Sequence, residues 1–135
     1  MSEKEFDILQ PKNWPAPKGY SNGIVAEGRL VFIAGQIGWN EHAWLVSDDF
    51  VAQAEQALSN IVQVLVEAGG EPRHIVRLTW YLTDKATYVA RQKEIGLAYR
   101  RVIGRHFPAM SAVIVAGLIE DGAKVEIEAT AVIPV

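Results

Sequence analysis

The sequence predicts a two-layer α+β sandwich that forms one domain over residues 1–135. Five segments have the apolar pattern of strands, and two have apolar residues at helical spacing. The order is β-β-α-β-α-β-β, so each helix connects two strands and covers one face of the sheet. The opposite face has no helix, yet it is expected to carry Ile75, Tyr81 and Val132. A sheet with apolar residues on both faces predicts self-association.

Composition excludes several classes of function. The chain has 13 Lys and Arg residues against 16 Asp and Glu residues, a net charge of −3, and no run of basic residues. We therefore expect no nucleic-acid partner, because phosphate binding needs clustered positive charge. The absence of cysteine excludes disulfides, thiolate metal sites and cysteine nucleophiles.

Neither a secretory signal nor a membrane span is recognisable. The first ten residues, MSEKEFDILQ, contain no apolar signal region. The longest apolar run, AVIVAGLI, is far shorter than the roughly 18–20 residues needed to cross a bilayer. We therefore expect a cytoplasmic domain without membrane contact.

The first part of the chain is predicted to form strands. The proline-rich segment 11–19 is expected to be an extended lead-in. Strands are predicted near 23–26 and 30–37, and Glu27-Gly28 is expected to join them as a hairpin because glycine accepts a positive φ. A loop over residues 38–47 follows.

The first helix is predicted to begin at Ser47, Asp48 and Asp49, whose oxygens suit the free N–H groups of a helix start. Gly69-Gly70 is expected to end it. The residues of its core-facing stripe are Phe50, Ala54, Ala57, Leu58, Ile61, Leu65 and Ala68. A strand over 74–83 follows, with Val76, Leu78, Trp80 and Leu82 on one face.

The second helix is predicted to begin at Thr83 and Asp84 and to end at Pro108. Strands over 110–119 and 123–133 complete the chain. The apolar stripe of this helix is formed by Tyr88, Ile95, Tyr99, Val102 and Ile103.

Candidate chemical groups are few. His42, His74 and His106 lack the spacing of metal ligands, so we expect surface or capping roles and neither a metal nor a cofactor. Glu126 and Glu128 project from one face of the last strand, with their carboxylates roughly 6–7 Å apart. Such a pair suits either acid–base catalysis or a solvated polar face, and spacing alone favours the polar face.

Three further features suit a small ligand but also have ordinary roles. Backbone N–H groups of Gly35-Gln36, after Ala34, fit an oxyanion or carboxylate, or simply end a strand. Tyr20-Ser21 supplies two hydroxyls with no base at a fixed spacing. Trp39 and Trp44 either cover a pocket or pack at an interface, and packing is the more common role. The residues alone therefore indicate a fold and an oligomer, but no reaction.

Four segments together resemble the RidA (YjgF) family of reactive-intermediate deaminases. They are GYSNGI before the first strand, LVFIAGQIG in the second, FPA at the corner after the second helix, and the closing KVEIEATAVI. The resemblance spans nearly the whole chain in the same order. It implies a chorismate-mutase-like fold and a homotrimer whose sheets line a central barrel. It also implies a small-molecule ligand in each of three inter-subunit clefts.

The resemblance also implies a chemistry, and one residue departs from it. The best-known members hydrolyse 2-imino acids to 2-keto acids and ammonia, and an arginine after Pro-Ala holds the substrate carboxylate by two contacts. Met110 stands at that position, and a thioether cannot donate those hydrogen bonds. Because losing one partner of a buried charge pair costs about 2–5 kcal/mol, usual binding of simple 2-imino acids should be severely weakened.

Other positions of the family pattern are partly changed and partly kept. Ala34 replaces a common serine, Ala112 replaces a common cysteine, and Gly96 aligns with a cleft asparagine of many members. By resemblance, Glu126 is the residue that orients the attacking water, which makes it and Tyr20 the catalytic candidates. The expected ligand-binding residues are Gly35, Gln36, Ala34, Met110 and Ala112.

Two hypotheses of different classes follow. The first is hydrolytic deamination of an enamine or imine other than a simple 2-imino acid, comparable to 2-aminomuconate deaminase, an arginine-lacking branch of the family. The second is a non-catalytic ligand-binding trimer, which the polarizable side chain of Met110 favours. A third, an endoribonuclease or translation inhibitor as some members are labelled, conflicts with the acidic charge.

Overall fold

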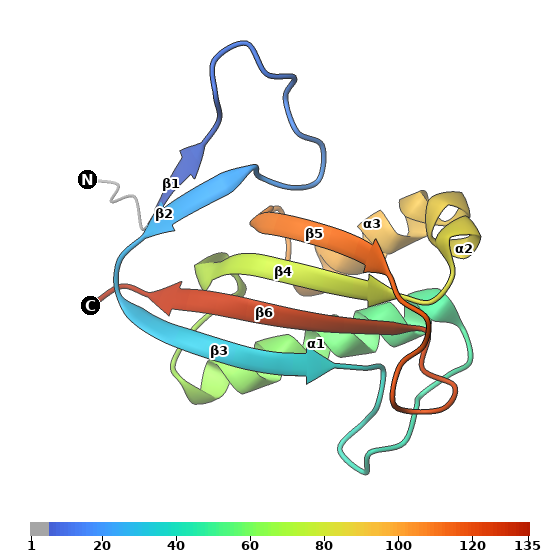
Figure 1. Ribbon diagram of the computed structural model, residues 1–135. Helices are drawn as coiled ribbons and strands as arrows, with labels where there is room; N and C mark the ends of the chain where they lie inside the picture. The colour runs from blue at the N-terminus through green and yellow to red at the C-terminus, as the bar shows by residue number, and fades with distance from the viewer. Residues whose placement is uncertain (1–5) are drawn as a thin grey trace.

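Two sheets and three α-helices make up the structure, a computed structural model that describes residues 6–135 (Figure 1). The strands are β1 (Phe6–Leu9), β2 (Gly23–Ala26), β3 (Arg29–Gln36), β4 (Ile75–Leu82), β5 (Ala109–Ile114) and β6 (Val125–Ile133). The helices are α1 (Phe50–Glu67), α2 (Lys85–Ala90) and α3 (Gln92–Val102), with a short 3₁₀ turn, η1 (Pro72–His74), before β4.

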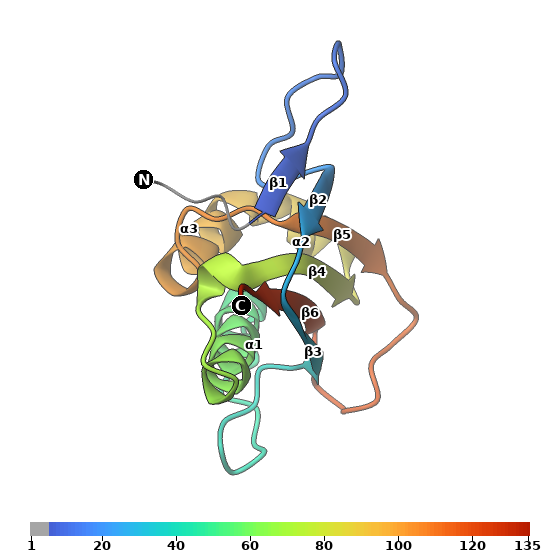
Figure 2. The same ribbon diagram turned by 90° about the vertical axis from the view of Figure 1, so that its left-hand side faces the viewer.

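The main sheet has the strand order β3-β6-β4-β5. Strands β4 and β5 are parallel, and the other neighbouring pairs are antiparallel. Helices α1 and α3 pack together on one face of this sheet (Figure 2). The core lies between the two layers, where α1 contributes the fully buried Ala54, Leu58, Ile61 and Leu65. The predicted two-layer α+β architecture is therefore confirmed.

The predicted hairpin at Glu27-Gly28 is wrong, although both of its strands exist as β2 and β3. Strand β2 pairs instead with β1, which no sequence pattern predicted, and the pair projects from the main sheet (Figure 1). The segment 11–19, expected as a lead-in, belongs to the connection between them. Gly28 forms a bend with φ of 149°, and a Cβ there would collide with the carbonyl of Ile133. This bend leads the chain into pairing with β6 instead of folding it back on β2.

Helix α1 begins and ends where the sequence predicts. The Asp49 carboxylate accepts a hydrogen bond of 2.9 Å from the backbone N–H of Ala52, as expected of an N-terminal cap. The helix ends immediately before Ala68 and Gly69-Gly70.

The second predicted helix is correct at its start and wrong at its end. Asp84 caps it by accepting a hydrogen bond from the backbone of Thr87. The helix is divided into α2 and α3 at Arg91, and α3 ends at Val102, shortly before Gly104, instead of continuing to Pro108. Gly104 has φ of 85°, the left-handed conformation that closes a helix C-terminus.

Pairing in β4 corrects the expected position of Ile75. The register of β4 against β6 shifts between Ile75 and Arg77, which places Ile75 in the core with no exposed surface. The expectation that Ile75 lies on the uncovered face is therefore wrong. Val76, predicted to share a face with Leu78, is only half buried for the same reason. The last two strands are also shorter than predicted at their loop ends.

The uncovered face of the main sheet carries both polar and apolar side chains. Tyr81 lies on it as predicted. It pairs with Glu126 of β6, and the neighbours of Glu126 along the strand, Val125 and Ile127, face the core on the other side of the sheet. Leu30 and Phe32 of β3 are 63% and 75% exposed on this face, and Val132 lies opposite Leu30. Within residues 6–135, no helix combines the length and the apolar content that a membrane span requires.

Candidate functional site

A cavity of about 640 Å³ lies beside α2 and α3, where these helices meet strands β4 and β5. Aromatic and apolar side chains form most of its lining, among them Trp80, Tyr88, Tyr99, Phe107 and Met110. Residues 18–20, at the end of the β1–β2 connection, close it on another side. Pockets of this size and character are typical of small-molecule sites.

Hydrogen bonds of Ser21 hold Tyr20 at the cavity. The backbone N–H of Ser21 donates to the carbonyl of Pro108 at 3.0 Å, and its hydroxyl donates to the carbonyl of Phe107 at 2.6 Å. Ser21 is 6% exposed, so its hydroxyl is occupied within the fold and does not contact a ligand, unlike the neighbouring Tyr20. The two hydroxyls expected to act as a pair therefore have different roles, because that of Ser21 is structural and Tyr20 lines the cavity.

Met110 and Ala112 both line this cavity, as the resemblance implies for a binding site. They pair with Leu78 and Trp80 of β4, which face the core, so their side chains point to the helix-covered side of the sheet. Met110 also packs against the core cluster. Gly96 of α3 lines the cavity too. Met110, at the corner after Pro108-Ala109, is therefore in contact with this cavity.

The other candidates lie on the uncovered face of the sheet, at the end of β3. The pairing of β3 with β6 shifts register between Ile33 and Gln36, which leaves Ala34 and Gly35 outside the regular ladder. Such irregularities re-aim backbone groups and are frequent beside active sites. The Gln36 side chain donates to the carbonyl of Ala34 at 3.2 Å.

Glu126 lies directly against this irregular segment. A Cβ built on Gly35 would lie 2.7 Å from the carboxyl carbon of Glu126, so the carboxylate covers the Gly35 backbone. The Glu126 side chain is half buried, and it forms no hydrogen bond or ion pair within residues 6–135. The structure thus brings Glu126 and Gly35 together, as the resemblance implies.

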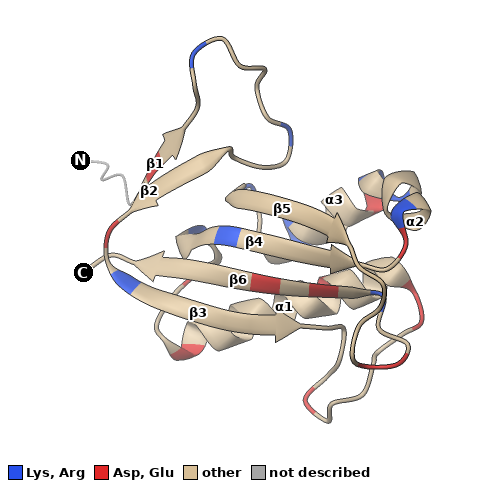
Figure 3. Cartoon of the chain, viewed as in Figure 1, with Lys and Arg blue, Asp and Glu red and all other residues tan. Residues whose placement is uncertain are grey.

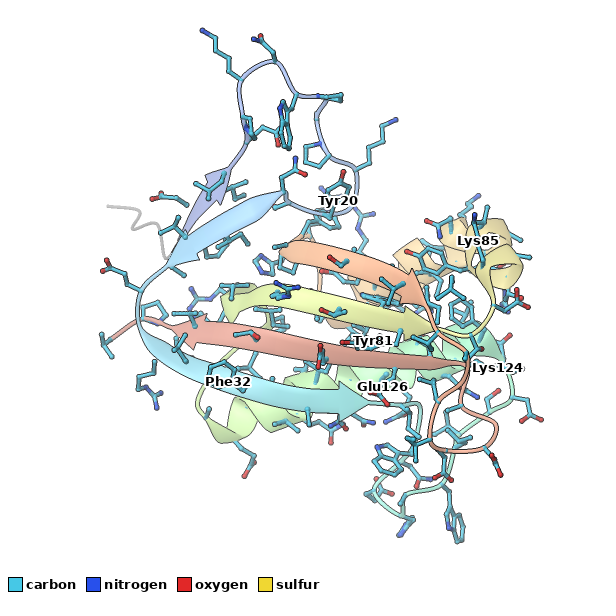
Figure 4. All side chains as sticks on the ribbon, in the orientation of Figure 1. Tyr20, Phe32, Tyr81, Lys85, Lys124 and Glu126 are labelled. Carbon is cyan, nitrogen blue, oxygen red and sulfur yellow. The ribbon has the colours of Figure 1, made fainter. Side chains whose placement is uncertain are left out.

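The two groups of candidates are separated within one chain. Tyr20 lies beyond the β5 edge and Glu126 lies on β6, on the face turned away from the helices (Figure 4). Glu126 does not line the cavity that contains Tyr20, Met110 and Ala112. Because the sheet separates the two groups, a single protomer does not place a ligand in contact with both.

Glu128, the second carboxylate of the pair, has a partner. The Tyr81 hydroxyl donates a hydrogen bond of 2.6 Å to it, and this bond raises the pKa of Tyr81. Figure 3 shows acidic residues along β6 and a basic residue on β4, which is Arg77, and the register places Arg77 on the same face as Tyr81. The environments of the two glutamates therefore differ, with Glu128 held by a tyrosine and Glu126 held over a glycine.

The histidines and the loop tryptophans lie away from the cavity. His74 accepts a hydrogen bond from the backbone N–H of Glu71, a capping role, while His106 is half buried with Nε2 2.6 Å from the carbonyl of Ile75. Trp39 and Trp44 do not line the cavity, and Trp44 is 70% exposed. In the part of the chain that the structure describes, no group of three potential metal ligands is present.

Sequence patterns did not identify several cavity residues. Tyr88 and Tyr99 fit the apolar stripe of a helix, and Trp80 fits the core face of a strand. Arg100 lies in the last turn of a helix, where a cation ordinarily offsets the negative end of the helix dipole. The signal that was available is Gly96, a helix-breaking residue inside an otherwise regular helix pattern.

Comparison with known proteins assigns the chain to a family. The sequence profile described as "Endoribonuclease L-PSP" matches residues 11–133. Protein DfrA of Myxococcus xanthus is 37% identical over 125 residues, which cover 87% of this chain and 89% of that protein. The 2-iminobutanoate/2-iminopropanoate deaminase of Capra hircus is 35% identical over 134 residues, covering 98% and 93%.

A solved structure supports the same assignment. The Rid-family protein YyfB of Yersinia pestis, described as a protein of unknown function, superimposes with a TM-score of 0.85 at 31% identity. The match covers 96% of this chain and 100% of that one. Sequence and fold agree over almost the whole length, and the chain therefore belongs to the RidA (YjgF) family, some of whose members are named as imine deaminases.

Proposed function

We propose that the protein is a hydrolytic deaminase of an imine or enamine other than a simple 2-imino acid, with Glu126 as the base that activates water. The observation that carries this proposal is the Glu126 carboxylate, unpaired within residues 6–135 and packed over the irregular backbone at Gly35. A free carboxylate beside backbone groups that lie outside the sheet ladder is suited to holding both a water molecule and a polarised substrate.

The chemistry needs no cofactor. Glu126 takes a proton from water as the water oxygen bonds to the imine carbon, and the C=N electron pair moves to nitrogen, which is protonated. The carbinolamine then loses ammonia as the C–N bond breaks, and its hydroxyl proton passes by way of Glu126 to the departing nitrogen, which leaves a carbonyl. An enamine is first protonated on carbon to give the imine. A positioned base of this kind contributes about 10²–10⁴-fold in rate.

Assembly belongs to the same proposal. Tyr20 and Met110 lie on one side of the sheet and Glu126 on the other, so a complete site needs residues from two copies. The exposed Leu30 and Phe32 on the uncovered face support burial of that face against another copy. A homotrimer with one cleft at each interface meets both requirements.

The test uses Met110→Arg as a background in which a known substrate class can be assayed. We expect wild type to release pyruvate slowly from freshly generated 2-iminopropanoate and Met110→Arg to be markedly faster. Adding Glu126→Gln to Met110→Arg is expected to remove about 10²-fold or more of that rate. Adding Glu128→Gln instead is the matched control, and the rate should be retained. Fast turnover by wild type would refute the argument from Met110, and full activity with Glu126→Gln would refute the role of Glu126.

A second candidate function is non-catalytic ligand binding. It is favoured by the absence of any carboxylate from the lining of the cavity, which leaves the cavity without a base of its own in one protomer. A metabolite that raises the melting temperature and is never consumed supports this alternative. Turnover of any such ligand excludes it.

A further inference from the structure

The charge of the cavity is opposite to that of the whole chain. The chain has a net charge of −3. Yet Lys18, Lys93 and Arg100 line the cavity, and no Asp or Glu does. Within residues 6–135, none of these three cations forms an ion pair, whereas Arg101 next to Arg100 is bound to Glu55 at 2.6 Å. Free cations around an aromatic cavity are complementary to an organic anion.

Two of these cations flank an open position on α3. Lys93, Gly96 and Arg100 follow at spacings of three and four, which places them on one helix face over successive turns. A Cβ added to Gly96 would have no atom within 4 Å. Packing therefore does not explain the glycine, although glycine in a helix interior costs about 1 kcal/mol relative to alanine. Its effect is to leave open space between two cationic side chains.

The wall of the cavity supplies an apolar counterpart. Trp80 is 2% exposed and its ring lies 6.5 Å, centroid to centroid, from that of Tyr88. Tyr99 stacks on Phe107 with ring centroids 5.8 Å apart. The indole Nε1–H of Trp80 is buried without a hydrogen-bond acceptor, and the surface around it is formed mainly by the faces and edges of aromatic rings. A ligand must place its apolar part here and its charge toward α3.

We propose that the cavity selects a carboxylate with an aromatic or similarly large apolar body, and that Lys93 and Arg100 hold the carboxylate over Gly96. This inference rests on the proposed function in naming the substrate class for the same site. Arg100 then supplies from α3 the positive charge that Met110 lacks on β5, and the ligand body lies between Trp80 and Met110. The preferred substrate is accordingly an imine or enamine with an aromatic-sized substituent and an acidic group.

Three stable probes separate the two halves of the ligand. Phenylpyruvate has both a ring and a carboxylate, pyruvate lacks the ring, and phenylacetone lacks the carboxylate. Isothermal titration of the full chain is expected to give a dissociation constant for phenylpyruvate about tenfold or more below those of the other two. The indole N–H signal of Trp80, assigned with Trp80→Phe, should shift on binding. Equal affinity for phenylpyruvate and phenylacetone would overturn the carboxylate site.

Matched variants test the residues. Arg100→Gln is expected to weaken phenylpyruvate binding about ten- to hundredfold, because a charge-assisted contact is lost. Arg101→Gln, which changes the neighbouring arginine that faces Glu55, should leave it unchanged. Gly96→Leu, which fills the open position on the helix, should weaken binding while circular dichroism shows a folded protein. Unchanged affinity in both Arg100→Gln and Gly96→Leu would overturn the inference.

Failure of the inference and failure of the proposed function are distinguishable. Binding is measured without turnover, so the affinity for phenylpyruvate is obtained independently of the hydrolytic role proposed for Glu126. Selective binding without hydrolysis of the corresponding aromatic imine supports the inference and contradicts the deaminase. Hydrolysis of small imines with no preference for phenylpyruvate contradicts the inference and supports the deaminase.

Discussion

The carboxylate of Glu126 occupies the space over the backbone of Gly35 that any other side chain would fill. A Cβ on Gly35 would lie 2.7 Å from the carboxyl carbon and 2.9 Å from the Cγ of Glu126. The two residues come from different strands, β6 and β3, at the point where their pairing changes register. The absence of a side chain at one position therefore sets the position of the carboxylate at the other.

Replacing Gly35 with alanine should displace Glu126. The added methyl group forces a shift in a packed contact, and such overpacking costs typically about 1–3 kcal/mol. We expect Gly35→Ala to lower the free energy of unfolding in urea by this amount and to reduce deaminase activity in the Met110→Arg background. Gly96→Ala is the control, because its Cβ meets nothing and should stabilise the helix by about 0.5–1 kcal/mol. Equal stability of the two variants would contradict the contact.

Removing the Ser21 hydroxyl should loosen the cavity wall that carries Tyr20. The hydroxyl donates a hydrogen bond of 2.6 Å to the backbone carbonyl of Phe107, which lies just before β5. We expect Ser21→Ala to cost about 1–3 kcal/mol in the free energy of unfolding. Hydrogen exchange of residues 18–20 should accelerate relative to α1, and unchanged exchange there would show that backbone contacts alone fix the segment.

Phe32 provides a test of assembly. Its side chain is 75% exposed on the uncovered sheet face, so a buried interface there cannot accept a charge without a partner. Light scattering of wild type is expected to give three times the 14.9 kDa mass of one chain. Phe32→Glu should give a smaller particle with unchanged circular dichroism, while Val66→Glu, on the exposed surface of α1, should not. A stable wild-type monomer would refute the trimer.

His106 makes stability depend on pH. Burial lowers the pKa of His106 below its ordinary value of 6.5, which outweighs the opposing effect of its hydrogen bond to the Ile75 carbonyl. The folded state therefore binds this proton less readily than the unfolded state. Stability is full above pH 6.5 and falls as the pH is lowered through that value toward the folded-state pKa. Urea midpoints measured from pH 8 to pH 5 should decrease accordingly.

The control for this pH dependence is His106→Gln. Glutamine keeps a donor for the Ile75 carbonyl but does not titrate, so the slope of stability against pH between 7 and 5 should become smaller. His42→Gln, which changes an exposed histidine, should leave the slope as in wild type. A slope that is the same in all three proteins would show that His106 does not cause it.

Local patterns predicted most elements of the fold. Asp49 and Asp84 cap α1 and α2 as expected, because capping is decided by residues within one turn. The hairpin at Glu27-Gly28 was wrong for the opposite reason. Gly28 does adopt a positive φ, but whether a turn closes a hairpin depends on which strand is free to pair, and β6 is adjacent to β3 while β1 is adjacent to β2. Strand β1, with the four residues FDIL, is too short to show a periodic pattern that marks it in sequence.

The candidate site was likewise predictable in its residues but not in their arrangement in space. The resemblance identified Tyr20, Met110, Gly35 and Glu126, and the structure joins Glu126 to Gly35 and Tyr20 to Met110. It does not join the two pairs within one chain. Strand alternation explains this, because Met110 faces the helices while Glu126 faces away from them. The face of the sheet that a side chain occupies depends on the register of its strand, and that register depends on pairing partners distant in sequence.

The sequence by itself determined the family, most of the helices and strands, and the thioether of Met110 at the corner after Pro108-Ala109, since these depend on residue identity and local spacing. Only the tertiary structure decided that Lys93 and Arg100 share a cavity with Trp80, that Ser21 is structural, and that Glu126 covers Gly35. These relations join residues far apart in the chain, and their contacts form only when the sheet pairs in one register and α3 packs against it.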